Sequence, residues 1–139
     1  MRLRHIASSI LALLAIATFT QCTTQKHWVG TWGTAGQLVE PHNNPPAPGL
    51  GGNTIRQIVQ VSIGGEEVRL QLTNEFSKEP TEIIAIELAH ATTSGSSSDI
   101  DRSTTVSLTF GGQSGITMQP GEIVTSDPVK FAMGDRQNV

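Results

Sequence analysis

The side chains that could carry chemistry are scattered through this chain. Its single cysteine, Cys22, follows an apolar stretch, and its four histidines lack the spacing of metal ligands. Asp99 and Asp101 open a segment that resembles a calcium loop. Thr104 and Phe110, however, stand where such a loop needs its glycine and its bidentate glutamate. We therefore favour a solvated loop over a calcium site, and we predict no metal and no cofactor.

Two further motifs are similar to functional motifs but lack their context. "GGQSG" has its glycines at offsets different from those of the G-x-S-x-G nucleophile elbow, so we interpret Ser114 as a turn residue. "GLGGNT" lacks the last glycine of a dinucleotide fingerprint, and it precedes an expected strand where that fingerprint would precede a helix. The sequence thus predicts no catalytic residue and no nucleotide site.

Trp28 and Trp32, the only tryptophans, are four residues apart. If residues 28–32 form a strand, both indoles lie on one face, where they could stack on a glycan or contact another domain. Packing of at least one of them in the core is the favoured alternative.

Residues 1–21 have the composition of an export signal. Arg2, Arg4 and His5 precede an apolar run over residues 6–19 that is too short to span a bilayer comfortably. The segment "TFTQCTTQK" then resembles a bacterial lipobox, which predicts lipidation of Cys22; the alternative is an unmodified thiol near a cleavage site. We expect an exported protein, periplasmic or at the cell surface, with a membrane anchor if Cys22 is acylated.

The expected mature chain is small and mildly acidic. Cleavage before Cys22 would leave 118 residues with seven Lys and Arg against 12 Asp and Glu, a net charge of −5. Nucleic-acid binding depends on clusters of Lys and Arg that neutralise phosphates, and this chain has none. We therefore exclude nucleic acid as a partner, and one hydrophobic core is feasible at this length.

The elements that must position these residues are predicted to be β-strands. Residues 22–52 read as an N-terminal segment, with an expected strand at 28–32, and a loop rich in Pro and Gly. From residue 53 the chain alternates apolar and polar residues, and "GGEE" at 64–67 predicts a hairpin turn. The apolar residues expected on the inner face of this hairpin are Val61, Ile63, Val68, Leu70 and Leu72, with Arg56 and Arg69 outside.

The same alternation continues to the end of the chain, with no amphipathic helix. The later inward positions are predicted to be Ile84, Ile86, Leu88, Val106, Leu108 and Phe110. Short strands with a turn signal every dozen residues or so are typical of an antiparallel β-sandwich. We predict an all-β, jelly-roll-like sandwich over residues 53–139, incomplete at its C-terminal end.

Four segments in this order resemble a known family: "HWVGTWGTA", "NTIRQIVQVSIGGEEVRLQLTNEF", "EPTEI" and "LTFGGQSGITMQPGEIVTSDPVKF". Over residues 28–131 the chain is similar to the N-terminal β-domain of secreted bacterial SGNH (GDSL-type) esterases. The resemblance implies an accessory domain followed, in the same chain, by an α/β catalytic domain that hydrolyses carboxylic esters such as acylated carbohydrates.

The catalytic pattern of that family does not map onto these residues. It begins with Gly-Asp-Ser, whereas the only Gly-Asp here, at Gly134 and Asp135, is followed by Arg136. Asn74 and Glu75 match the family's "NEF" without a catalytic role to carry over. We therefore expect a chain truncated before the catalytic domain and inactive alone. The alternatives are a stand-alone glycan-binding module at the cell surface or a structural lipoprotein domain.

Overall fold

A computed structural model describes residues 26–92 and 99–139, and every regular element among them is a β-strand. The predicted signal and Cys22 lie outside the described residues. No helix in the described part could serve as a membrane span. The predicted all-β, antiparallel fold is confirmed. The strands are β1 (Gly65–Val68), β2 (Gln71–Thr73), β3 (Thr81–Ile83), β4 (Glu87–Ala91), β5 (Ile100–Ser107), β6 (Ile116–Met118), β7 (Ile123–Thr125) and β8 (Val129–Met133).

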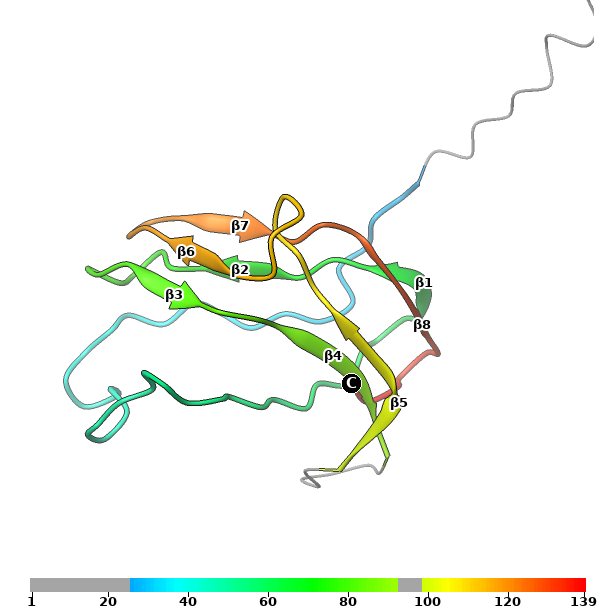
Figure 1. The fold of residues 1–139 in the computed structure, drawn as a ribbon, viewed down its shortest axis with the longest axis horizontal. Coiled ribbons are helices and arrows are strands. Elements are labelled where there is room, and N and C mark those ends of the chain that lie inside the picture. Colours follow the sequence, from blue (N-terminus) through cyan, green and yellow to red (C-terminus); the bar gives the residue numbers. More distant parts are fainter. Residues whose placement is uncertain (1–25, 93–98) are drawn as a thin grey trace, which may run out of the picture.

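The strand pairs are nested like one long, rolled hairpin (Figure 1). β4 pairs with β5 at the inner end, β3 with β6, β2 with β7 and β1 with β8, all antiparallel. An isolated antiparallel bridge between Gln60 and Asn138 extends this pairing beyond β1 and β8. Residues 59–91 therefore run antiparallel to residues 100–139.

The predicted local hairpin across "GGEE" is wrong. β1 pairs with β8, far along the chain, and Val59 pairs with Val139. Gly64 does not adopt the positive φ that a tight turn would need. A Cβ on Gly64 would instead collide with the carbonyl oxygen of Met133 and come within 2.9 Å of the Gly134 carbonyl carbon. The glycine thus allows two backbones to approach closely, which sequence alternation alone does not distinguish from a turn.

The core forms around the strands of the second half of the chain. Leu108 is fully buried, and the other buried hydrophobic residues are Val61, Phe110, Met118 and Phe131. The predicted inner positions Leu108 and Phe110 are confirmed, and Val106 is half-buried opposite Leu88 of β4. In the first half, Val68, Leu70 and Leu72 are half-buried, while Arg56 and Arg69 are exposed as predicted.

Two predicted inner positions are wrong. Ile63 is exposed, because the chain pairs with Thr31 at this point and not with a hairpin partner. Ile84 is 80% exposed. β3 ends at Ile83, and the alternation shifts before β4 begins, so that Ile86 and Leu88 turn inward and Ile84 turns outward. A one-residue shift of register moves a side chain to the opposite face of a sheet.

Candidate interaction surface

The N-terminal segment lies beside β1 and the residue that follows it, and side chains hold it there. The Lys26 ammonium contacts both carboxylate oxygens of Glu67, at 2.8 and 2.6 Å. Two residues further along each segment, the Arg69 guanidinium carbon lies 3.9 Å from the centre of the Trp28 ring. An exposed ion pair contributes about 0–1 kcal/mol, and an exposed cation–π contact about 0.5–1 kcal/mol. The segment is therefore attached weakly through these two pairs.

Thr31 provides the main hydrogen-bonded link between this segment and the rest of the fold. Its carbonyl oxygen accepts bonds from the Ser62 amide (2.9 Å) and hydroxyl (2.8 Å). Its hydroxyl donates to the Ile63 carbonyl (2.6 Å) and accepts from the Ile63 amide (3.1 Å). Residues 28–32 do not form the strand that the sequence predicts. Among them, Thr31 makes the backbone pairing to residues 62 and 63.

The two tryptophans occupy different environments. Trp28 is half-buried beneath Arg69, so one of its ring faces is already occupied. Trp32 is 47% exposed. Trp32 is thus the tryptophan better placed to contact a ligand or a second domain.

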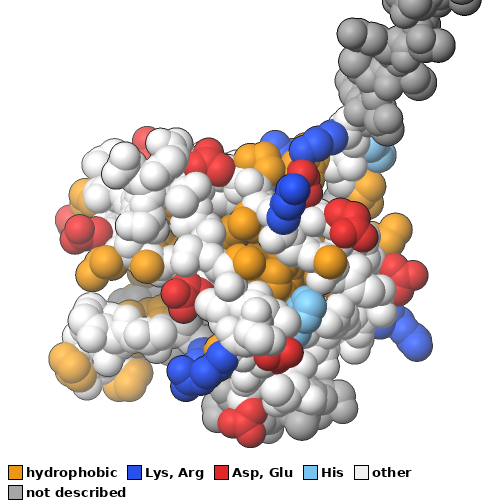
Figure 2. All heavy atoms as spheres, turned by 45° about the vertical axis from the view of Figure 1, so that its right-hand side comes forward, with side chains coloured by type: hydrophobic (Ala, Val, Ile, Leu, Met, Phe, Trp, Pro, Cys, Tyr) orange, Lys and Arg blue, Asp and Glu red, His pale blue; other side chains and the backbone are white. Residues whose placement is uncertain are grey.

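Large hydrophobic side chains are exposed mainly on the N-terminal third of the described chain. Seven of the ten exposed ones lie between residues 29 and 63, and we call them the N-terminal apolar set: Val29, Trp32, Leu38, Val39, Leu50, Ile55 and Ile63. This part of the chain has long stretches without strands and includes the loop around residues 40–53 (Figure 1). Figure 2 shows hydrophobic side chains reaching the surface in the middle of one face, among polar and charged groups.

Asn74 is a buried polar residue that joins two of the strand pairs. Its side-chain amide donates to the carbonyls of Glu79 (3.0 Å) and Met118 (3.2 Å), and its side-chain oxygen accepts from the Thr81 hydroxyl (3.0 Å). Its backbone amide donates to the Glu122 carbonyl (2.8 Å). Asn74 therefore has a structural role at the junction of β2, β3 and β6.

Asp127 fixes the turn that contains Gly111 and Gly112. Its carboxylate accepts bonds from the Thr109 hydroxyl (2.6 Å), the Gly112 amide (2.8 Å) and the Gly111 amide (3.2 Å). These bonds, that from the Thr109 hydroxyl most of all, lower the pKa of Asp127 below its usual value. Both glycines have positive φ, and Ser114 is exposed just beyond them, as expected of a turn residue.

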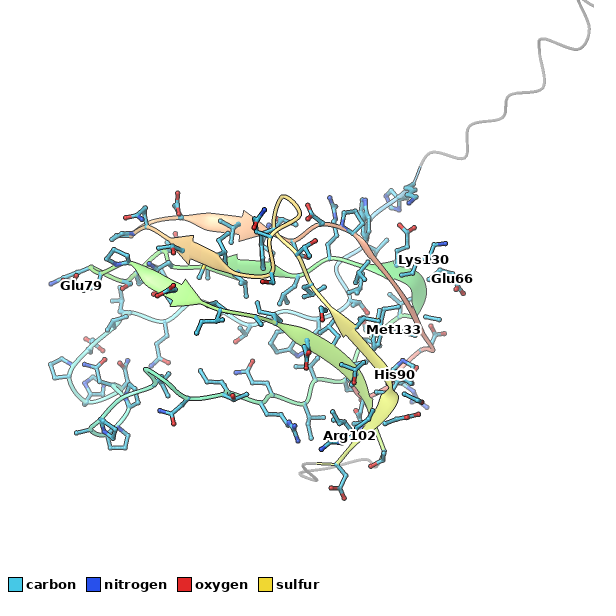
Figure 3. The ribbon with its side chains drawn as sticks, in the orientation of Figure 1. Glu66, Glu79, His90, Arg102, Lys130 and Met133 are labelled. Carbon is cyan, nitrogen blue, oxygen red and sulfur yellow. The ribbon has the colours of Figure 1, made fainter. Side chains whose placement is uncertain are left out.

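His90 and Asp101 also bind backbone groups close to them in space. His90, on β4 and labelled in Figure 3, places its Nε2 2.9 Å from the carbonyl oxygen of Ala132 on β8. Its ring lies 4.7 Å from that of Phe131. The Asp101 carboxylate accepts bonds from the Ser103 hydroxyl (2.6 Å) and amide (3.0 Å), which lower its pKa. Within residues 26–92 and 99–139, no three His, Cys, Asp or Glu side chains gather as a metal site would require.

Comparison of the chain with known protein families and with curated proteins found no match. The sequence motifs and the surface of the N-terminal third therefore supply the basis for a functional proposal. The sequence pointed to Trp28 and Trp32; it marked Asn74 only as part of the "NEF" segment, without a role, and it gave no signal for Asp127. Asp127, in the segment after β7, meets Thr109, in the segment after β5, and neither residue stands in a local motif that indicates the contact.

Proposed function

We propose that this chain is the accessory N-terminal β-domain of an exported SGNH-type esterase. Its role is to hold a catalytic unit of the same polypeptide, which hydrolyses carboxylic esters such as acylated carbohydrates. The ordered series of segments from "HWVGTWGTA" to "SDPVKF" supports the family. The nucleophile, its base and the oxyanion hole belong to the catalytic unit.

The exposure of the N-terminal apolar set is the main observation that supports an accessory role, because exposed apolar side chains favour contact with another domain. Side chains such as Leu38 and Ile55 are 60% and 61% exposed, whereas four of the five buried hydrophobic residues come from residue 108 onward. Burying apolar surface contributes roughly 25 cal/mol per Å², so a second domain that covered side chains of this set would be stabilised by their burial.

The reading frame beyond the codon for Val139 tests the proposal. We expect it to continue into an apolar strand that ends in Gly-Asp-Ser. The longer polypeptide should hydrolyse an aryl acetate, and a serine-directed inhibitor should abolish that activity, while the present chain alone should not exceed the buffer rate. A stop codon after Val139, or turnover by the present chain, would overturn the proposal.

Lipidation of Cys22 belongs to the same proposal, because an exported chain with a single cysteine has no disulfide partner within itself. We expect the wild-type protein to partition with membranes into detergent, and Cys22→Ala to move it to the soluble periplasm or the medium. A soluble wild-type protein with a titratable thiol would contradict this expectation.

The exposure of Trp32 favours one alternative, a glycan-binding module at the cell surface. Exposed indoles stack on sugar rings, and both tryptophans lie in the segment that lies beside β1. With only two tryptophans in the chain, quenching or shift of the fluorescence on titration with an oligosaccharide would support this function. Trp32→Ala should then abolish the signal, whereas Val29→Ala should leave it unchanged.

A further inference from the structure

The outermost pair of the roll is a short ladder in regular register. Val59 and Val139 exchange both backbone hydrogen bonds, each at 2.9 Å. The Val61 amide donates to the Gln137 carbonyl at 2.9 Å, and Gln60 lies opposite Asn138. Residues 59–61 thus face residues 139–137 one to one, without a bulge.

On one strand of this ladder, the backbone continues beyond the pairing. Residues 54–58 precede Val59 without a turn or bend, and Ile55 is 61% exposed. Figure 1 shows this stretch running toward the C-terminus along one side of the molecule. In an antiparallel ladder, N–H and C=O groups of alternate residues point to the same edge. Those of Gln57 and Ile55 therefore point to the edge that Val139 occupies beside Val59.

These edge groups lack partners in the described part of the chain. Neither Ile55 nor Gln57 makes a hydrogen bond with any residue in 26–92 or 99–139. The stretch contains no proline, which would block strand addition, and Arg56 is its only charged residue. An edge of this kind is a template for β-augmentation, in which main-chain hydrogen bonds provide affinity.

We propose that residues 54–58 are a strand-accepting edge, filled by an extended segment of the catalytic unit that continues the line of residues 137–139. The source of the strand rests on the proposed function. The register gives its alignment: its first residue faces Ile58, its second faces Gln57 and its fourth faces Ile55. An apolar residue at the fourth position would cover the exposed Ile55 side chain, because directly opposite residues share a face.

A short extension of the full chain tests this edge. The chain is extended after Val139 by Thr-Val-Thr-Val-Thr, and the matched control carries proline at the second and fourth added positions. Amide hydrogen exchange is followed residue by residue by NMR. We expect the strand extension to slow exchange of the Gln57 and Ile55 amides by about tenfold or more relative to the control. Exchange at Ile58, whose amide points to the opposite edge, should stay the same.

Each other outcome contradicts the proposal. Equal exchange rates at Gln57 and Ile55 in the two extended chains would show that the edge accepts no strand. Loss of protection at Leu108 in the strand-extended chain alone would do the same, since an added strand only adds hydrogen bonds to the fold. A dimer of the unextended chain with slow exchange at both amides would assign the edge to a second copy.

The exchange experiment does not involve catalysis. The strand-accepting edge and the esterase assignment can therefore be contradicted independently of each other. A stop codon after Val139 would overturn the esterase assignment and leave the exchange result intact. Equal exchange rates would remove the edge while the longer reading frame and its activity remained.

Discussion

Asp127 shows how a single carboxylate organises a turn from a distance. The Gly111–Gly112 turn depends on positive φ at both glycines, and the Asp127 carboxylate bonds to both of their amides as well as to the Thr109 hydroxyl. An ionised carboxylate is the better acceptor for these three donors. The folded protein therefore favours the charged form of Asp127.

This preference predicts a pH dependence. Because the pKa of Asp127 is lower in the folded state than its usual value of 3.8, its stabilisation is complete well above pH 3.8 and is lost as the pH falls below it. Asp127→Asn should lower the melting temperature at pH 7 and make its decline below pH 4 shallower. Thermal unfolding between pH 2 and 7 measures this, with Glu66→Gln as the exposed control. An identical pH profile for Asp127→Asn and the wild type would contradict the prediction.

Single residues were predictable where their setting is local. The turn at Ser114 follows from neighbouring glycines, and the alternation around Leu108 identified it as an inner position. The contacts of Asn74 with Met118 and of Asp127 with Thr109 join segments far apart in sequence. Such contacts depend on how the strands pair, which periodicity does not specify.

At the scale of elements, glycine positions mark where backbones meet. A Cβ on Gly115 would lie 2.7 Å from the carbonyl oxygens of both Ile83 and Ile84, at the end of β3. The backbone there cannot give way as a flexible side chain would. Gly115 therefore allows β6 to begin pairing with β3 directly after the turn.

Replacement of Gly115 by alanine should destabilise the protein by about 1–3 kcal/mol, the usual cost of overpacking. Gly30→Ala is the matched control, because a Cβ on Gly30 meets nothing within 4 Å. Urea denaturation of the two variants measures the difference. Equal midpoints would show that β3 and β6 do not approach closely at this position.

The strands were predicted better than their partners. Alternation located the strands around Leu72 and Val106. The pairing of β1 was predicted locally, across Gly64, because two glycines followed by polar residues have the composition of a hairpin turn. Gly64 could serve a tight turn or a close approach of two backbones. The collision that a Cβ on Gly64 would make with Met133 shows that it serves the second purpose, and this collision is visible only in the folded backbone.

At the scale of the whole molecule, the hydrophobic core of the described residues is small, and most of it comes from the second half of the chain. Leu108 lies at its centre, and Leu108→Ala should cost about 2–5 kcal/mol through lost burial and a residual cavity. This is a large share of the roughly 5–15 kcal/mol that stabilises a typical domain. We therefore expect Leu108→Ala to unfold at a much lower denaturant concentration or to lose cooperative unfolding.

Ile84→Ala is the control, since it removes a similar aliphatic side chain that is 80% exposed. It should change the free energy of unfolding by less than about 0.5 kcal/mol. Comparable losses for both variants would place Ile84 in the core, as the sequence pattern predicted, and would contradict the shift of register between β3 and β4.

The nested pairing also determines when the molecule can close during its synthesis. Asn138 lies opposite Gln60 and accepts a hydrogen bond from the Ala91 amide at 3.1 Å, so the last residues join both ends of the first arm. Val59 must wait for a partner about 80 residues later, and ribosomes add about 5–20 residues per second, so the wait lasts several seconds. The inner pair, β4 with β5, can form long before that. The inner strands can therefore pair first, and the outermost pair, between residues 59–61 and 137–139, is the last to form.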